Sequence, residues 1–464
     1  MNDYHAFLAS KAIAFQPSGF EVDPGSLNPH LFPFQRDILK LALRMGRFCI
    51  WSRYGTGKAF MALEWSNQVQ RHTQQNVIIL APLMVALQFV DEGNKFGIPV
   101  KYCRKQSEVE PGITVTNYEM LEHFDISQFA GVALDEASAI RDETSQRFED
   151  IIAAFAQTPY KSDWSATPSP NDYMEIGSHS EFMGVMSRSE MLAMFFTHDG
   201  GDTSKWRLKK HAEHKFWEWV ASWAIYVRKP SDVNPDYDDS LYQLPPLHEK
   251  PVVIDTAIDA PEGQLFFTEA KTLAELRHVG KASLQDRVSA AASIANGSDE
   301  QFIVWCYTND ESKLLTKAIP DAVEVRGSDS RKHKQESMQR FKTGEVRIIV
   351  TKASIFGFGI NLQNCHNAIF IGLNHQWEAY IQAVHRLWRF GQESEVTNYI
   401  IYHHLEGAVV RNIDRKGRND ERMADAMVQA QRSIDYSSLK AVGRDETEYN
   451  PQIEMILPDW LVSA

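Results

Sequence analysis

The run Gly55-Thr56-Gly57-Lys58 has the residue types and spacing to bind phosphate. It follows an apolar stretch at 48–51 and precedes a plausible helix that starts near residue 60. Glycines let backbone N–H groups converge on phosphate oxygens, a helix start adds partial positive charge, and a lysine can reach the β- and γ-phosphates. A glycine-rich turn with an exposed lysine is the alternative. We predict an ATP phosphate site that comprises Tyr54, Gly55, Thr56, Gly57, Lys58 and Ala59.

Two adjacent carboxylates, Asp135 and Glu136, follow a second apolar stretch at 131–134. Phosphoryl transfer uses an aspartate to hold Mg²⁺, and a second carboxylate can orient and deprotonate the attacking water. We assign Asp135 to Mg²⁺ and Glu136 to the water. Taken alone, the pair reads better as a solvated acidic loop, but the order of the two motifs favours a site that hydrolyses ATP.

Ala59 stands where a serine or threonine hydroxyl normally ligates Mg²⁺. Because Mg²⁺ readily keeps several waters, water can substitute for the missing ligand. We therefore expect hydrolysis to be weakened rather than absent.

Gln382, Arg386 and Arg389 are spaced to share one face of a helix. Arginine binds phosphate with two parallel hydrogen bonds, which suits the charge that develops on a γ-phosphate. With the upstream motifs, Arg386 and Arg389 are predicted to be arginine fingers. Without them, a surface helix with salt bridges would be the better interpretation.

These residues need a scaffold, and two segments alternate short apolar strands with helix-like stretches, a pattern typical of parallel α/β sheets. The strands of the first fall near 48–51, 77–80, 113–116 and 131–134, and those of the second near 302–306, 346–350 and 368–371. We predict a first domain at 1–229 with a helical insertion at about 172–229, a linker at 230–248, a second domain at 249–420 and a helical tail at 421–464. The tail reads as a strap across one domain or as a docking site for a protein partner.

The composition is that of a globular protein, with 43% hydrophobic and 23% charged residues among 464. No apolar run is long enough for a membrane span, and no signal-peptide pattern is present, so we expect no membrane association and a cytoplasmic location. Four scattered cysteines argue against a zinc site or a disulfide framework. The net charge of −13 means that any polyanion site must be local.

Residues 203–229 are locally basic, with tryptophans interleaved among the cations. Lysine and arginine neutralise nucleic-acid phosphates without reading sequence, so we assign Lys209, Lys210, Arg228 and Lys229 to nucleic acid. The aromatic residues at 216, 219 and 223 fall at helical spacing and predict a packed face. The two interpretations can coexist on opposite faces. A second basic cluster at 331–334 reads as a solvated helix start.

With these residues in order, the chain resembles the Swi/Snf-like branch of superfamily 2 helicases from residue 31 to about 415, and is most similar to compact phage and prophage members. Phe34-Gln35 resembles the adenine-recognising glutamine motif, and the phosphate loop resembles motif I. The later motifs match at 81–83, 116–119, 135–138, 165–168, 359–363 and 382–392. Besides Ala59, Ser138 and residues 354–356 depart from the usual pattern.

The resemblance implies two RecA-like domains with parallel sheets and an ATP site in the cleft between them. It also implies nucleotide contacts from Gln35, Gly359 and Gln382, and nucleic-acid contact from Asn361. We expect a DNA-stimulated motor that translocates on double-stranded DNA in a bacterial or phage-infected cell and remodels nucleoprotein or branched DNA. A strand-separating DNA or RNA helicase and a weakly hydrolysing, nucleotide-gated DNA-binding module are the alternatives.

Overall fold

The first domain is built on a sheet of seven parallel strands in the order β3-β4-β2-β5-β6-β1-β9. The computed structural model describes residues 17–199, 202–259, 269–270, 272–356 and 361–433. The strands are β1 (Arg47–Ser52), β2 (Asn76–Ala81), β3 (Val100–Tyr102), β4 (Ile113–Asn117), β5 (Phe129–Asp135), β6 (Tyr160–Ser165) and β9 (Ala224–Val227). All four strands predicted for this domain are confirmed.

Both faces of this sheet are covered, as the continuous apolar strands require. Phe48 and Ile50 of β1 pack under α2 (Pro33–Met45), α3 (Lys58–Thr73) and α4 (Leu83–Phe96). Cys49 and Trp51 point to the opposite face, because neighbouring residues of a strand alternate. The helices on that face are α5 (Gln146–Ala154), α6 (Ile176–Met183), α7 (Arg188–Phe195) and α8 (Glu213–Ala221).

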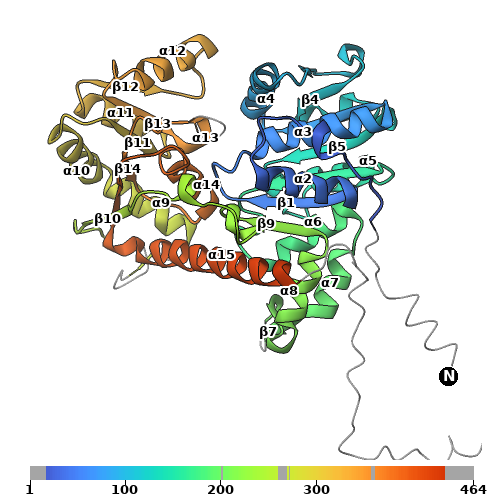
Figure 1. The fold of residues 1–464 in the computed structure, drawn as a ribbon. Coiled ribbons are helices and arrows are strands. Elements are labelled where there is room, and N and C mark those ends of the chain that lie inside the picture. Colours follow the sequence, from blue (N-terminus) through green and yellow to red (C-terminus); the bar gives the residue numbers. More distant parts are fainter. Residues whose placement is uncertain (1–16, 200–201, 260–268, 271, 357–360, 434–464) are drawn as a thin grey trace, which may run out of the picture.

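The region predicted as a helical insertion contains a feature that the sequence pattern did not indicate. Strands β7 (Phe196–Asp199) and β8 (Asp202–Leu208) form an antiparallel hairpin below the first domain (Figure 1). Phe216, Trp219 and Trp223 are buried, as their helical spacing predicted.

The second domain has six parallel strands in the order β10-β15-β14-β11-β13-β12. They are β10 (Leu247–Ile254), β11 (Phe302–Cys306), β12 (Ala322–Val325), β13 (Ile348–Lys352), β14 (Asn367–Ile371) and β15 (Val396–His403). Its helices are α9 (Leu273–Ala282), α10 (Leu284–Asn296), α11 (Asn309–Ala318), α12 (Arg331–Lys342), α13 (Ala353–Phe356) and α14 (Trp377–Val384). The two parallel sheets confirm the predicted fold class, and the basic cluster at 331–334 does begin a helix.

The connection between the domains is packed rather than free. Tyr237 donates a hydrogen bond of 2.5 Å from its hydroxyl to Asp37 of α2. The ring of Tyr242 lies edge-on to Phe34, with ring centroids 5.5 Å apart. The second sheet already begins at Leu247, within the range predicted as linker.

Helix α15 (Gly407–Ser433) joins the two domains and starts well before the predicted tail (Figure 1). Val409 and Ile413 lie in the core of the second domain. Met423 and Met427 lie in the core of the first. The helix therefore straps both domains, whereas a strap across one was expected, and residues 434–464 lie outside the described part. Among the described residues, no helix is long and apolar enough to cross a membrane.

Candidate nucleotide site and interdomain cleft

The phosphate loop joins β1 to α3, which begins at Lys58. Gly55 and Gly57 have φ of 88° and 86°, a region that glycine adopts without steric cost. Lys58 Nζ donates to the carbonyl oxygens of Ser52 at 2.7 Å and Arg53 at 3.2 Å. The loop thus has the strand–turn–helix geometry that converges N–H groups on an anion.

Gln35 fixes this loop to the start of α2. Its Nε2 donates to the Thr56 carbonyl oxygen at 2.7 Å, and its Oε1 accepts from the Phe32 N–H at 2.9 Å. A Cβ added to Gly57 would lie 2.4 Å from the same Nε2, so the two elements are in close contact. The structure places Gln35 beside the loop, where the glutamine motif was expected.

Asp135 ends strand β5, and Glu136 follows it in the left-handed region with φ of 51°. That conformation is rare for a residue other than glycine and is typical of functional sites. Burial raises the pKa of Asp135, and repulsion from Glu136 raises it further. Burial also raises the pKa of Glu136, although Lys58 and Arg386 lower it.

A divalent cation fits this acidic edge. Asp135 is buried, the carboxylate of Glu136 beside it repels it, and bound Mg²⁺ would compensate the charge of both. Glu136 Oε2 is buried and has no hydrogen-bond partner among the described residues, which leaves an acceptor for a water. Ala59 offers no side-chain oxygen as a ligand.

The second domain reaches the site directly after α14. The ring of His385 stacks on Tyr54, with centroids 4.5 Å apart and planes at 26°. A Cβ added to Gly55 would lie 2.9 Å from the Cβ of Phe390. Arg386 is buried at 4% exposure, and its charge interacts with that of Glu136. The two domains therefore meet at the phosphate loop.

The predicted shared helix face is wrong, because α14 ends at Val384. Arg386 and Arg389 lie in the turn that follows. Gln392 holds this turn by donating to the carbonyl oxygens of Leu387 at 3.2 Å and Cys365 at 3.1 Å. Burial lowers the pKa of Arg389 to about 10, and the neighbouring Arg386 contributes.

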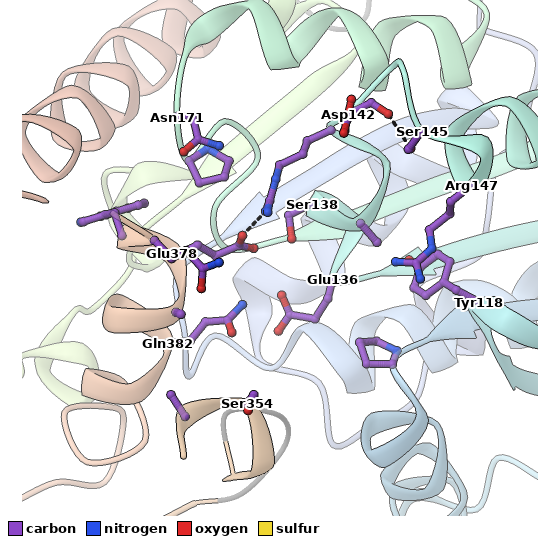
Figure 2. Close-up of a pocket in the computed structure, with 18 of the residues that line it drawn as sticks. Tyr118, Glu136, Ser138, Asp142, Ser145, Arg147, Asn171, Ser354, Glu378 and Gln382 are labelled. Carbon is purple, nitrogen blue, oxygen red and sulfur yellow. Dashed lines mark hydrogen bonds and ion pairs between the residues drawn. The ribbon is translucent and has the colours of Figure 1, made fainter. Parts of the chain in front are cut away.

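A cavity of about 1390 Å³ lies between the domains, with Glu136 and Gln382 on its wall (Figure 2). Asn361 is exposed, and Gly359 lies outside the described residues. The basic residues of the cavity are ones that the sequence did not single out: Arg141, Arg147, Lys352 and Lys416. Only their positions at the carboxyl edges of the sheets, Arg141 in the loop after β5 and Lys352 as the last residue of β13, could have indicated them.

The four basic residues assigned to nucleic acid lie outside this cavity. Lys209 Nζ donates to the carbonyl oxygens of residues 193 and 194 at the end of α7, at 3.1 and 2.9 Å. Arg228 pairs with Asp425 of α15 at 2.6 Å, and Lys229 pairs with Asp239 of the linker at 2.7 Å. Lys210 is exposed at the turn before α8. Among the described residues that line the cavity, none belongs to this group.

Comparison with known proteins identifies the second domain. Residues 285–391 match the family model "Helicase conserved C-terminal domain". The chain carries a helicase C-terminal domain. This helicase C-terminal domain contributes His385, Arg386 and Phe390 to the contacts described above.

Two curated relatives match 104 residues each. Eukaryotic initiation factor 4A of Dictyostelium discoideum is 28% identical, over 22% of this chain and 25% of that protein. The ATP-dependent RNA helicase eIF4A of Yarrowia lipolytica (strain CLIB 122 / E 150) is 27% identical, over 22% and 26%. The chain thus spans about a quarter of the length of these relatives.

Among solved structures, the Sulfolobus solfataricus SWI2/SNF2 ATPase core in complex with dsDNA aligns with a TM-score of 0.42 and 17% identity. The alignment covers 89% of this chain and 97% of that one.

Proposed function

We propose that this protein is an ATP-driven, DNA-stimulated motor that translocates on double-stranded DNA and remodels nucleoprotein or branched DNA. One observation carries the proposal: the second domain meets the phosphate loop of the first at the segment that contains Arg386, because His385 stacks on Tyr54 and Phe390 lies against Gly55. A site divided in this way is complete only when the domains approach each other. Hydrolysis and release can therefore be coupled to domain motion.

Each residue has a role in this scheme. The phosphate loop and Lys58 bind the ATP phosphates, and Asp135 would hold Mg²⁺, which supplies charge neutralisation on the β- and γ-phosphates. Glu136 orients the attacking water and accepts its proton. Arg386 and Arg389 stabilise the charge that develops on the γ-phosphate.

The proposed DNA site is the interdomain cavity. Its four basic residues come from both domains and from α15, as a track between two moving bodies requires. Such contacts give sequence-independent, salt-sensitive binding. The resemblance of the motifs to Swi/Snf-like proteins supports duplex DNA as the track.

ATPase rates without nucleic acid and with single-stranded DNA, duplex DNA or RNA test the proposal. Duplex DNA should stimulate most, and Glu136→Gln should reduce the stimulated rate by about 10²–10⁴-fold. Displacement of a triplex-forming strand from an intact duplex should then report translocation. No stimulation by any nucleic acid, or full activity of Glu136→Gln, would refute the motor.

A strand-separating RNA helicase is the second candidate. Both curated relatives described above are named as initiation factor 4A, and one of them is also named an ATP-dependent RNA helicase. It predicts that RNA stimulates most and that duplex strands separate without triplex displacement. The third candidate, a weakly hydrolysing binding module, is motivated by Ala59 and predicts negligible turnover with every nucleic acid.

A further inference from the structure

An ion pair bridges the cavity from one domain to the other. Arg141 of the first domain follows the turn after Glu136, and Glu378 lies in the first turn of α14 in the second domain. Arg141 Nη1 donates to Glu378 Oε2, as the dashed line in Figure 2 shows. The Glu378 side chain is 15% exposed and that of Arg141 is 37% exposed, so the pair is partly shielded from water.

Glu378 also lies near the nucleotide site. Glu378 and Glu136 line the same interdomain cavity, one from each domain (Figure 2). On the helix, Glu378 and Gln382 are four residues apart and share one face. Arg386 lies two residues beyond the end of this helix. A force on Glu378 is therefore transmitted to the segment that carries the arginine fingers.

Two of the other three cations of the cavity also have acceptors within the protein. Arg147 pairs with Glu119 at 3.0 Å, and Lys416 donates to Asn171 at 2.6 Å. A phosphate oxygen entering the cavity must compete with these acceptors. Arg141 differs from Arg147 because its acceptor comes from the opposite domain.

We propose that Glu378 is a positioning residue that couples nucleic-acid binding to ATP hydrolysis. It acts through Arg141. Without a polyanion, the Glu378 carboxylate holds Arg141 and fixes α14. When a backbone phosphate of nucleic acid takes the guanidinium, Glu378 is released, and α14 can move Arg386 from its resting position near Glu136 toward the γ-phosphate. The inference rests on the proposed function, and it adds a residue through which the track switches on hydrolysis.

Glu378→Gln is the primary test. It should raise the ATPase rate without nucleic acid by at least about 5-fold, the lower end of typical allosteric coupling, and reduce the fold-stimulation by duplex DNA. It should also tighten DNA binding, because Arg141 no longer has an anionic competitor. Arg141→Gln should raise the basal rate in the same way but weaken DNA binding. These opposite effects on affinity separate coupling from general damage.

Two further variants complete the experiment. Glu336→Gln removes the same charge from an exposed pair with Lys332 on α12, and should leave every rate unchanged. The exchange Arg141→Glu with Glu378→Arg should restore the bridge and the low basal rate. If duplex DNA stimulates the wild type but Glu378→Gln has an unchanged basal rate, or the exchange fails to lower it, the coupling role is refuted. If nucleic acid never stimulates the wild type, the proposed function itself fails.

Discussion

Gly55→Ala should hold the two domains apart. The Cβ that it adds would lie 2.9 Å from Phe390 Cβ and 3.0 Å from Phe390 N. Part of the obstacle is backbone, which cannot rotate away as the end of a side chain can. The clash exists only while the helicase C-terminal domain touches the phosphate loop, so the substitution penalises the closed state.

The size of the effect follows from two terms. The φ of 88° costs a residue with a Cβ about 1–2 kcal/mol, but this cost is the same in the open and closed states. The clash with Phe390 is an overpacking cost of about 1–3 kcal/mol that the open state avoids. The ratio of closed to open molecules should therefore fall by about 5- to 150-fold. The rate of DNA-stimulated hydrolysis should fall with it.

Fluorescence transfer between dyes at Glu122 and Lys332 measures the separation directly, and the cysteines of the described part are buried. Gly57→Ala is the matched control. It has the same strain at φ of 86°, but its Cβ meets Gln35 within the first domain. Both variants should bind nucleotide more weakly, and only Gly55→Ala should lengthen the distance between the dyes. Equal distances in the two variants would show that the loop does not set closure.

Three further predictions concern the strap, the metal and pH. Met427→Ala removes a fully buried side chain of α15 from the core of the first domain and should lower Tm by roughly 5–15 °C. Gln429→Ala changes an exposed residue of the same helix and should leave Tm unchanged. Equal Tm values for the two variants would contradict the packing of the strap. Ala59→Thr supplies the missing hydroxyl and should raise kcat and lower the Mg²⁺ concentration needed for half-maximal ATPase activity. If both values stay unchanged, Ala59 does not leave a Mg²⁺ ligand missing. Burial lowers the pKa of His179, but the Asp163 carboxylate at 2.5 Å outweighs it and the net pKa is raised. Such a histidine stabilises the fold fully below its unfolded pKa of about 6.5 and loses that contribution as pH rises through the folded pKa. Between pH 6 and pH 9, wild-type Tm should therefore fall more than that of His179→Gln, and parallel curves would exclude the contribution.

The sequence was informative where a property is local. Buried parallel strands are short, continuous apolar runs, so four strands of the first sheet and three of the second could be placed before any contact was known. The edge strands β3, β9, β10 and β12, together with β6 and β15, were not predicted. Lys58 and Asp135 could be placed beside each other because carboxyl ends of parallel strands meet at one edge. The hairpin β7–β8 was not predicted because its strands are mostly polar, with only isolated apolar residues.

Charge was the least predictable property, because an ion pair depends on partners far along the chain. Arg228 sits in a basic stretch and reads as a DNA contact, yet its partner Asp425 is 197 residues away. Arg141 and Glu378 are separated by 237 residues, and neither stands out in its own neighbourhood. A local count of cations therefore finds surfaces that already have internal partners, and it misses cations brought into the cleft by the fold.

Helix α15 makes the same point for the coupling between domains. Glu421 pairs with Arg53 next to the phosphate loop, and Gln431 exchanges hydrogen bonds of 3.0 and 3.1 Å with Tyr226 on the edge strand β9. The first half of the helix belongs to the core of the second domain. A rotation of that domain must therefore bend the helix or break these contacts beside the phosphate loop. The strap is thus mechanically part of the nucleotide site, although the pattern of its residues indicates no chemistry.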